Sequence, residues 1–185
     1  MRSRLAVLAL TLLAAGACDN KPAERAAATL PPPPPSVEQP AAAAGGACTR
    51  LNYEYVKKAI GVRFTVAAAN QAEGVSSCVL QTVDATWPDL TLAVIGSTAA
   101  TADQFLDDLM PAKGIKLKGL GKAAYLLKSP ASGAHGPAVE IGWLNAAKQI
   151  QTLRFTFPKS AASTAVTQMN RQLFTLAKAM DAPKS

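Results

Sequence analysis

Residues 19–46 divide the chain into parts of very different composition. Their sequence, DNKPAERAAATLPPPPPSVEQPAAAAGG, is dominated by Ala and Pro and has almost no large apolar side chain. Such a segment buries too little surface to offset the conformational entropy that is lost on ordering. We therefore expect a disordered linker here and a folded domain at residues 47–185. This remainder of about 140 residues is the size of one domain with one hydrophobic core.

The first 17 residues have the layout of a secretory signal peptide. Arg2 and Arg4 precede the apolar residues 5–13, and the small residues 14–17 follow. A positive start, an apolar stretch and a small-residue end are the three parts of such a signal. As a helix the apolar stretch spans about 14–20 Å, which is short of the ~30 Å hydrocarbon core of a bilayer. We expect residues 1–17 to be removed on export.

Cys18 directly follows this segment, and two peptidases would recognise the site. Ala15-Gly16-Ala17 fits ordinary signal peptidase. The same residues with Cys18 resemble the lipobox of bacterial lipoproteins, which implies a lipidated Cys18 at the new N-terminus, anchored on the periplasmic or outer face of a bacterial membrane. In a cell with two membranes, Asp19 resembles the signal for retention at the inner membrane. The alternative is a soluble exported protein with a free Cys18.

The cysteine count favours the lipidated form. The chain has three cysteines, Cys18, Cys48 and Cys78, and an odd thiol in an exported protein needs an explanation. Lipidation of Cys18 leaves Cys48 and Cys78 as a pair, so we expect a disulfide between them. Closing the roughly 30-residue loop contributes about 3.6 kcal/mol in the chain-entropy model. The alternative, a free buried Cys78, requires a reducing compartment, which the signal peptide argues against.

The charge of the chain argues against nucleic acid as a partner. Loss of Arg2 and Arg4 with the signal leaves 17 of the 19 Lys and Arg residues against 12 Asp and Glu, a net charge of +5. This balance suits anionic lipid or an acidic partner, but it lacks the clustered footprint of a nucleic-acid binder. Export makes nucleic acid still less suitable.

The domain shows three helix signals. Asn52 and Gly61 are suited to cap the two ends of a first helix. Thr101 begins a second helix with Gln104 at capping-box spacing, and Pro111 ends it. The third helix, residues 160–180, has apolar residues at steps of three and four, which we interpret as its core-facing side.

Between these helices lie apolar and β-branched segments that are typical of strands. Gly119-Leu120-Gly121 and the loop at Asn145 each separate two such segments and predict hairpins. The resulting order, α-βββ-α-ββββ-α, predicts an α+β domain with a mainly antiparallel sheet of about five to seven strands, covered by two or three helices. The expected strands are residues 62–66, 76–84, 90–97, 115–118, 122–128, 139–144 and 151–157.

No set of residues predicts catalysis, a metal or a cofactor. His135 is the only histidine, so it cannot complete a zinc site, and no G-x-S-x-G elbow accompanies it. We interpret it as an exposed loop residue. Asp103, Asp107 and Asp108 are interpreted as the polar side of the second helix. The glycines of Gly119-Leu120-Gly121 lack the third glycine of a dinucleotide fingerprint.

Five lysines form the one notable charge feature. They occur within sixteen residues that contain no acid: Lys113, Lys116, Lys118, Lys122 and Lys128. One interpretation is a sheet edge guarded against aggregation. The other is a contact surface for anionic lipid headgroups or an acidic protein.

Residues 47 to about 180 resemble small secreted lipoproteins of unknown function. The resemblance rests on Cys48 before the first helix, Gly61 after it, Cys78 in a strand, and the segment 119–124, Gly-Leu-Gly-Lys-Ala-Ala. That family is similar to the extracellular sensor domains of some membrane-bound Ser/Thr kinases. It implies an antiparallel sheet flanked by helices and the binding of a ligand or partner, with no catalytic residues.

These observations lead to one main hypothesis and two alternatives. The main hypothesis is a non-enzymatic envelope lipoprotein whose disulfide-linked domain binds a protein partner or a small ligand outside the cytoplasm. The first alternative is an immunity or inhibitor lipoprotein that neutralises a toxic envelope hydrolase. The second is a hydrolase that uses His135 as its base.

Overall fold

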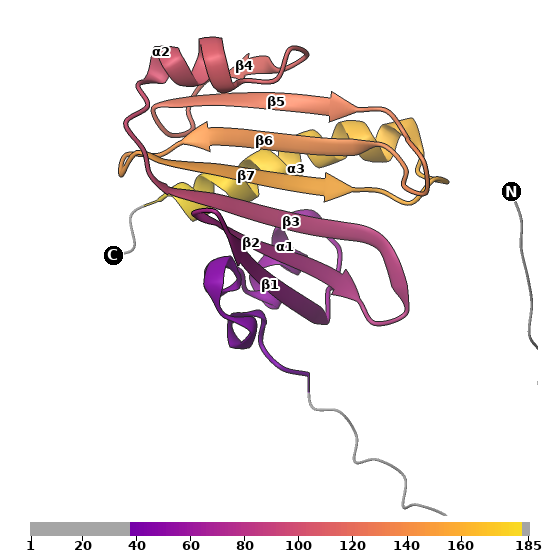
Figure 1. The fold of residues 1–185 in the computed structure, drawn as a ribbon. Helices are drawn as coiled ribbons and strands as arrows, with labels where there is room; N and C mark the ends of the chain where they lie inside the picture. The colour runs from indigo at the N-terminus through magenta and orange to yellow at the C-terminus, as the bar shows by residue number, and fades with distance from the viewer. Residues whose placement is uncertain (1–37, 183–185) are drawn as a thin grey trace, which may run out of the picture. The chain divides into compact units, whose positions relative to one another are not determined.

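The computed structural model describes residues 38–182. Cys18, the predicted signal peptide and most of the predicted linker lie outside these residues. The described chain forms an antiparallel sheet in the order β1-β2-β3-β7-β6-β5-β4 (Figure 1). The strands are β1 (Val66–Ala72), β2 (Val75–Thr82), β3 (Ala85–Ser97), β4 (Ile115–Leu117), β5 (Ala123–Ser129), β6 (Ala138–Leu144) and β7 (Gln149–Thr156).

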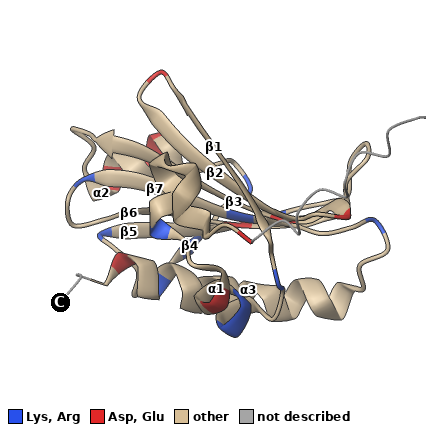
Figure 2. Cartoon of the chain, turned by 90° about the horizontal axis from the view of Figure 1, so that it is seen from below, with Lys and Arg blue, Asp and Glu red and all other residues tan. Residues whose placement is uncertain are grey.

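Helices lie on both faces of this sheet. Figure 2 shows α1 (Tyr53–Ile60) and α3 (Ser163–Asp181) together below the sheet. The 3-10 helices η1 (Ala41–Ala44) and η2 (Gly46–Arg50) pack against β1. The short α2 (Ala102–Gln104) continues into the π-helix η3 (Phe105–Leu109), which contacts β5 on the opposite face. The predicted α+β class and the predicted order of elements are confirmed.

The helix caps form as their residues predict. The side chain of Asn52 accepts a hydrogen bond from the Tyr55 N–H, and Gly61 ends α1 in the left-handed conformation at φ 78°. Thr101 and Gln104 make the reciprocal bonds of a capping box at the start of α2. These contacts satisfy backbone groups that a helix end otherwise leaves unpaired.

The main core lies between α3 and the sheet. Leu173, Leu176 and Ala177 of α3 are fully buried in the same cluster as Ile141 and Trp143 of β6. The apolar side of α3 therefore faces the core. The last residue of α3 fastens the helix, since the Asp181 carboxylate accepts hydrogen bonds from Trp143 Nε1 and from the Gly121 N–H, both at 3.1 Å.

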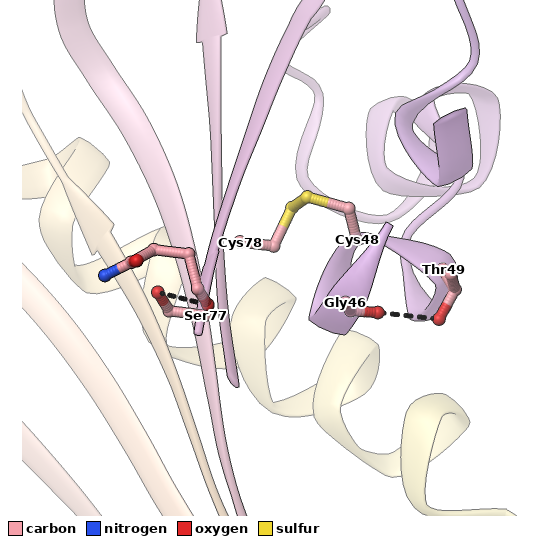
Figure 3. Close-up of a disulfide and its surroundings, with 6 residues drawn as sticks. Gly46, Cys48, Thr49, Ser77 and Cys78 are labelled. Carbon is pink, nitrogen blue, oxygen red and sulfur yellow. Dashed lines mark hydrogen bonds between the residues drawn. A yellow bond between two sulfur atoms is a disulfide. The ribbon is translucent and has the colours of Figure 1, made fainter. Parts of the chain in front are cut away.

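A disulfide joins Cys48 in η2 to Cys78 in β2, as the cysteine count predicts. Both cysteines are completely buried. Figure 3 shows the bond beside the turn of η2, where the Thr49 hydroxyl donates to the Gly46 carbonyl at 2.8 Å. The disulfide therefore fixes the N-terminal helices to the sheet.

The first strand does not lie where the sequence predicts it. Residues 62–65 are not part of the sheet, and β1 is the following segment, Val-Ala-Ala-Ala-Asn-Gln-Ala. These residues have low strand propensity, but Glu73 and Gly74 have φ values of 51° and 79° and form a tight turn that pairs Ala72 with Val75. The hairpin thus overrides local propensity.

Packed structure also begins before residue 47, the predicted start of the domain. Ala41 is 1% exposed within the main core, and the Arg63 guanidinium contacts the Glu38 carboxylate at 2.9 Å. The linker prediction rested on the absence of large apolar side chains. The methyl group of Ala41 is large enough to fill its position in the core, because η1 lies close to β1.

We expect loss of the disulfide to lower the free energy of unfolding by about 2–4 kcal/mol. The double variant Cys48→Ala/Cys78→Ala tests this in urea unfolding of the chain, compared with the oxidised wild type. The cause is the additional entropy of an unfolded chain whose cysteines, 30 residues apart, are no longer linked. An unchanged free energy of unfolding would contradict it.

Candidate functional site

One part of the sheet has no helix over it within the described residues. From Val75 to Val79 in β2 and from Thr91 to Ile95 in β3, the side chains that point away from α1 and α3 are half-buried or exposed. On the other side of these strands, Cys78, Leu80, Leu90 and Leu92 are fully buried. We call the residues that point away the open face. They are Val75, Ser77, Val79, Thr91, Ala93 and Ile95.

A charged pair borders the open face. Glu140 of β6 lies directly opposite Arg154 of β7, and the Arg154 Nη1 contacts Glu140 Oε2 at 3.2 Å. The Tyr125 hydroxyl donates to Glu140 Oε1 at 2.8 Å. Burial raises the pKa of the Tyr125 hydroxyl, and the negative charge of Glu140 adds to this effect. Tyr125 therefore acts as a neutral hydrogen-bond donor that holds Glu140 in place.

Asp89, at the start of the apolar part of β3, is 8% exposed. Its Oδ1 atom has no hydrogen-bond partner among the described residues. Burial raises the pKa of the Asp89 carboxyl above its ordinary value of 3.8, while Thr156, Arg154 and His135 oppose the shift. A buried carboxylate with an unpaired oxygen lowers the free energy of unfolding. Asp89 is therefore not placed there to stabilise the core.

His135 was predicted to be an exposed loop residue, but it is half-buried. Its ring lies edge-on to the Trp87 ring, with 5.6 Å between centroids, and Nδ1 lies 2.8 Å from the Gly136 carbonyl oxygen. Ser132 meets His135 only through backbone hydrogen bonds of 3.2 Å. The ring therefore packs against β3, and this serine is not activated by it. We call Trp87, Asp89, His135, Glu140 and Arg154 the polar cluster.

The three aspartates of the second helix do not form a shared site. Asp103, Asp107 and Asp108 are exposed, and Asp107 contacts Lys116 at 3.6 Å. Among residues 38–182 there is no group of three or more side chains suited to hold a metal ion.

The five lysines do not share one face. Lys116 lies in β4 at the edge of the sheet, on the side of η3, where it contacts Asp107. Lys128 lies on the opposite face, where its Nζ is 3.1 Å from the side-chain amide of Asn170. Lys113, Lys118 and Lys122 are exposed in the segments around β4. Lysines that are close in sequence are thus separated by the pleat of the sheet.

The polar cluster was not predicted, although part of its signal is visible in the sequence. Residues 139–144 were predicted as a strand, and in a strand with Val139, Ile141 and Trp143 on one face, Glu140 points to the other. The loop at Asn145 then sets the register that brings Arg154 opposite it. Asp89 had no such signal, because an acid after Pro88 is equally typical of a turn.

Comparison with known proteins gave no relative. No protein-family model, curated protein sequence or solved structure matches the chain. Within residues 38–182, no helix combines the length and the apolar character that crossing a membrane requires.

We expect Asp89 to make stability depend on pH. A carboxyl whose folded-state pKa is raised favours the folded state at low pH and loses this contribution as the pH rises through the interval above 3.8. The free energy of unfolding of Asp89→Asn, relative to wild type, should therefore increase between about pH 3 and pH 7. Urea unfolding at several pH values measures it, with the turn variant Asp84→Asn as the matched control. A difference that is independent of pH would contradict the assignment.

Proposed function

We propose that this protein is a lipid-anchored protein of the bacterial cell envelope whose domain binds a protein partner outside the cytoplasm. Cys18, behind a signal peptide, provides the anchor in this proposal, and the linker that follows carries the domain. The partner binds at the open face.

The observation that supports this proposal is the character of the open face. It combines Val75, Val79 and Ile95 with small hydroxyl residues, and it has no charged side chain of its own. Ile95 is 41% exposed. The processed chain has a net charge of +5, and an uncharged, partly apolar surface on it has the composition of an interface core. The polar cluster at its border supplies a polar rim.

The contacts within the polar cluster favour binding over catalysis. Arg154 and the neighbouring Tyr125 both bond to Glu140, which is the arrangement of a structural ion pair. A general base must reach the proton that it removes and must be oriented by a neighbour. His135 is held instead against Trp87 and the Gly136 carbonyl.

The anchor is tested by the variant Cys18→Ser. We expect the wild-type chain to sediment with membranes and to carry a lipid on Cys18, which mass spectrometry of the N-terminal peptide detects. The variant cannot be lipidated and should be found in the soluble fraction or remain unprocessed. A wild-type chain that is soluble and has an unmodified Cys18 would contradict the anchor.

The open face is tested by Ile95→Glu, with Ile115→Glu as the matched control. Both isoleucines are exposed residues of strands, but Ile115 lies in β4 at the far edge of the sheet. With the full chain as bait in an envelope extract, we expect Ile95→Glu to lower recovery of the bound protein about tenfold or more, because a buried charge at an interface core is costly. Ile115→Glu should leave recovery unchanged. Equal recovery with both variants would contradict the open face as the site.

The same capture separates the alternative partners. Material that is lost when the five lysines are changed to Gln, and that washes off with salt, would assign binding to the lysines instead. A retained hydrolase that loses activity on binding would identify the protein as an inhibitor.

A further inference from the structure

A groove runs between α1 and α3, which lie together below the sheet in Figure 2, on the side away from the open face. The residues that line it come from both helices and are Tyr55, Lys58, Ala59, Arg171, Gln172 and Thr175. Ala59 is half-buried against the main core, and its small side chain leaves room between the helices. The volume of about 310 Å³ is at the lower end of the ~300–1,000 Å³ of small-molecule sites. The groove therefore has the size to hold a small molecule.

Each helix contributes one cation to this groove. Lys58 of α1 and Arg171 of α3 are both exposed. The ion pairs among residues 38–182 involve other cations, namely Arg63, Lys116 and Arg154. No carboxylate of the described chain lines the groove. Two positive charges that share one hollow, with no acid beside them, favour an anionic ligand.

The donors of the groove indicate which anion fits. The Gln172 amide and the Tyr55 hydroxyl can each donate a hydrogen bond, whereas the Thr175 hydroxyl already donates to the Arg171 carbonyl at 3.0 Å. A guanidinium binds two phosphate oxygens at once, and a lysine ammonium binds phosphate as a point charge. Two cations also match the charge of a phosphate monoester, about −1.5 to −2 at pH 7. A carboxylate carries only a single charge and has fewer acceptor oxygens.

The surface around the groove favours a soluble ligand over a membrane. A helix that lies on a bilayer exposes large apolar side chains next to its cations. In the described parts of α1 and α3, the large apolar or aromatic side chain that is exposed is Tyr55, at 43%. The exposed carboxylate of Glu54, the residue before it, would be repelled by an anionic membrane. The Tyr55 ring and the Ala59 methyl group instead provide an apolar part of the groove for the organic part of a phosphate ester.

We propose that the groove between α1 and α3 binds a small, water-soluble phosphate monoester. Arg171 and Lys58 hold the phosphate, Gln172 donates a hydrogen bond to it, and the Tyr55 ring contacts the organic group. This site lies on the opposite side of the sheet from the open face, and it requires neither the anchor nor the protein partner.

Phenyl phosphate is the probe, because it joins a phosphate to an apolar ring. Isothermal titration calorimetry of the full chain in non-ionic detergent, at a constant ionic strength of ~0.15 M, should give a dissociation constant of about 1 mM or lower. Phenol, which lacks the phosphate, should not bind over the same range. A chain that shows no binding up to ~20 mM phenyl phosphate, or that binds phenol equally well, would overturn the proposal.

Single substitutions identify the groove. Lys58→Gln and Arg171→Gln should each weaken binding of phenyl phosphate about tenfold or more, because each removes a charge-assisted contact. Lys57→Gln and Lys178→Gln are the matched controls, since they make the same change of charge on the same two helices at exposed residues outside the groove. Both controls should bind as the wild type does, and urea unfolding checks that all four variants fold. Equal weakening by the controls would show that total charge governs binding, and the proposal would be wrong.

A competition titration separates the soluble ester from a lipid headgroup. Dihexanoyl phosphatidylglycerol, added below its micelle concentration, should displace phenyl phosphate no better than dihexanoyl phosphatidylcholine does. If phosphatidylglycerol displaces the probe and binds more tightly than it, and if Lys58→Gln and Arg171→Gln abolish that binding, the groove holds a membrane headgroup and the proposal is overturned.

Discussion

The pairing of β3 with β7 is the contact on which the rest of the structure depends. It joins residues 89–97 to residues 149–156 and thereby connects two separate meanders, β1–β3 and β4–β7, into one sheet. On one side it places Leu92 opposite Leu153 in the main core, and on the other it places Asp89 opposite Thr156 beside the polar cluster. The same register therefore creates both the core and the candidate site.

The sequence predicted those parts of the fold that depend on local chemistry. Caps at Asn52 and Thr101 and the hairpin loop at Asn145 act over a few residues, and the structure contains each of them. It did not predict β1, because an alanine-rich strand is stabilised by its partner β2 and not by its own propensity. Ala41 was missed for a similar reason, since its burial depends on what packs around it.

The candidate site was harder to predict because its residues come from distant segments. Trp87 and Asp89 lie in β3, His135 in a loop, and Glu140 and Arg154 in β6 and β7. Only the non-local β3–β7 pairing brings them together, and no periodicity within one segment reveals such a pairing. The lysines show the converse, because residues close in sequence lie apart: Lys116 contacts Asp107 on the side of η3, and Lys128 lies near Asn170 on the other face.

The position of α3 after all seven strands also has a consequence for how the domain is made. Until α3 has been synthesised, the apolar side of β6, with Ile141 and Trp143, has no cover, and neither Trp143 Nε1 nor the Gly121 N–H has its Asp181 partner. A nascent chain that ends before this helix holds every strand and yet lacks a closed core. Closure of the core over β6 therefore waits for the last helix of the described chain.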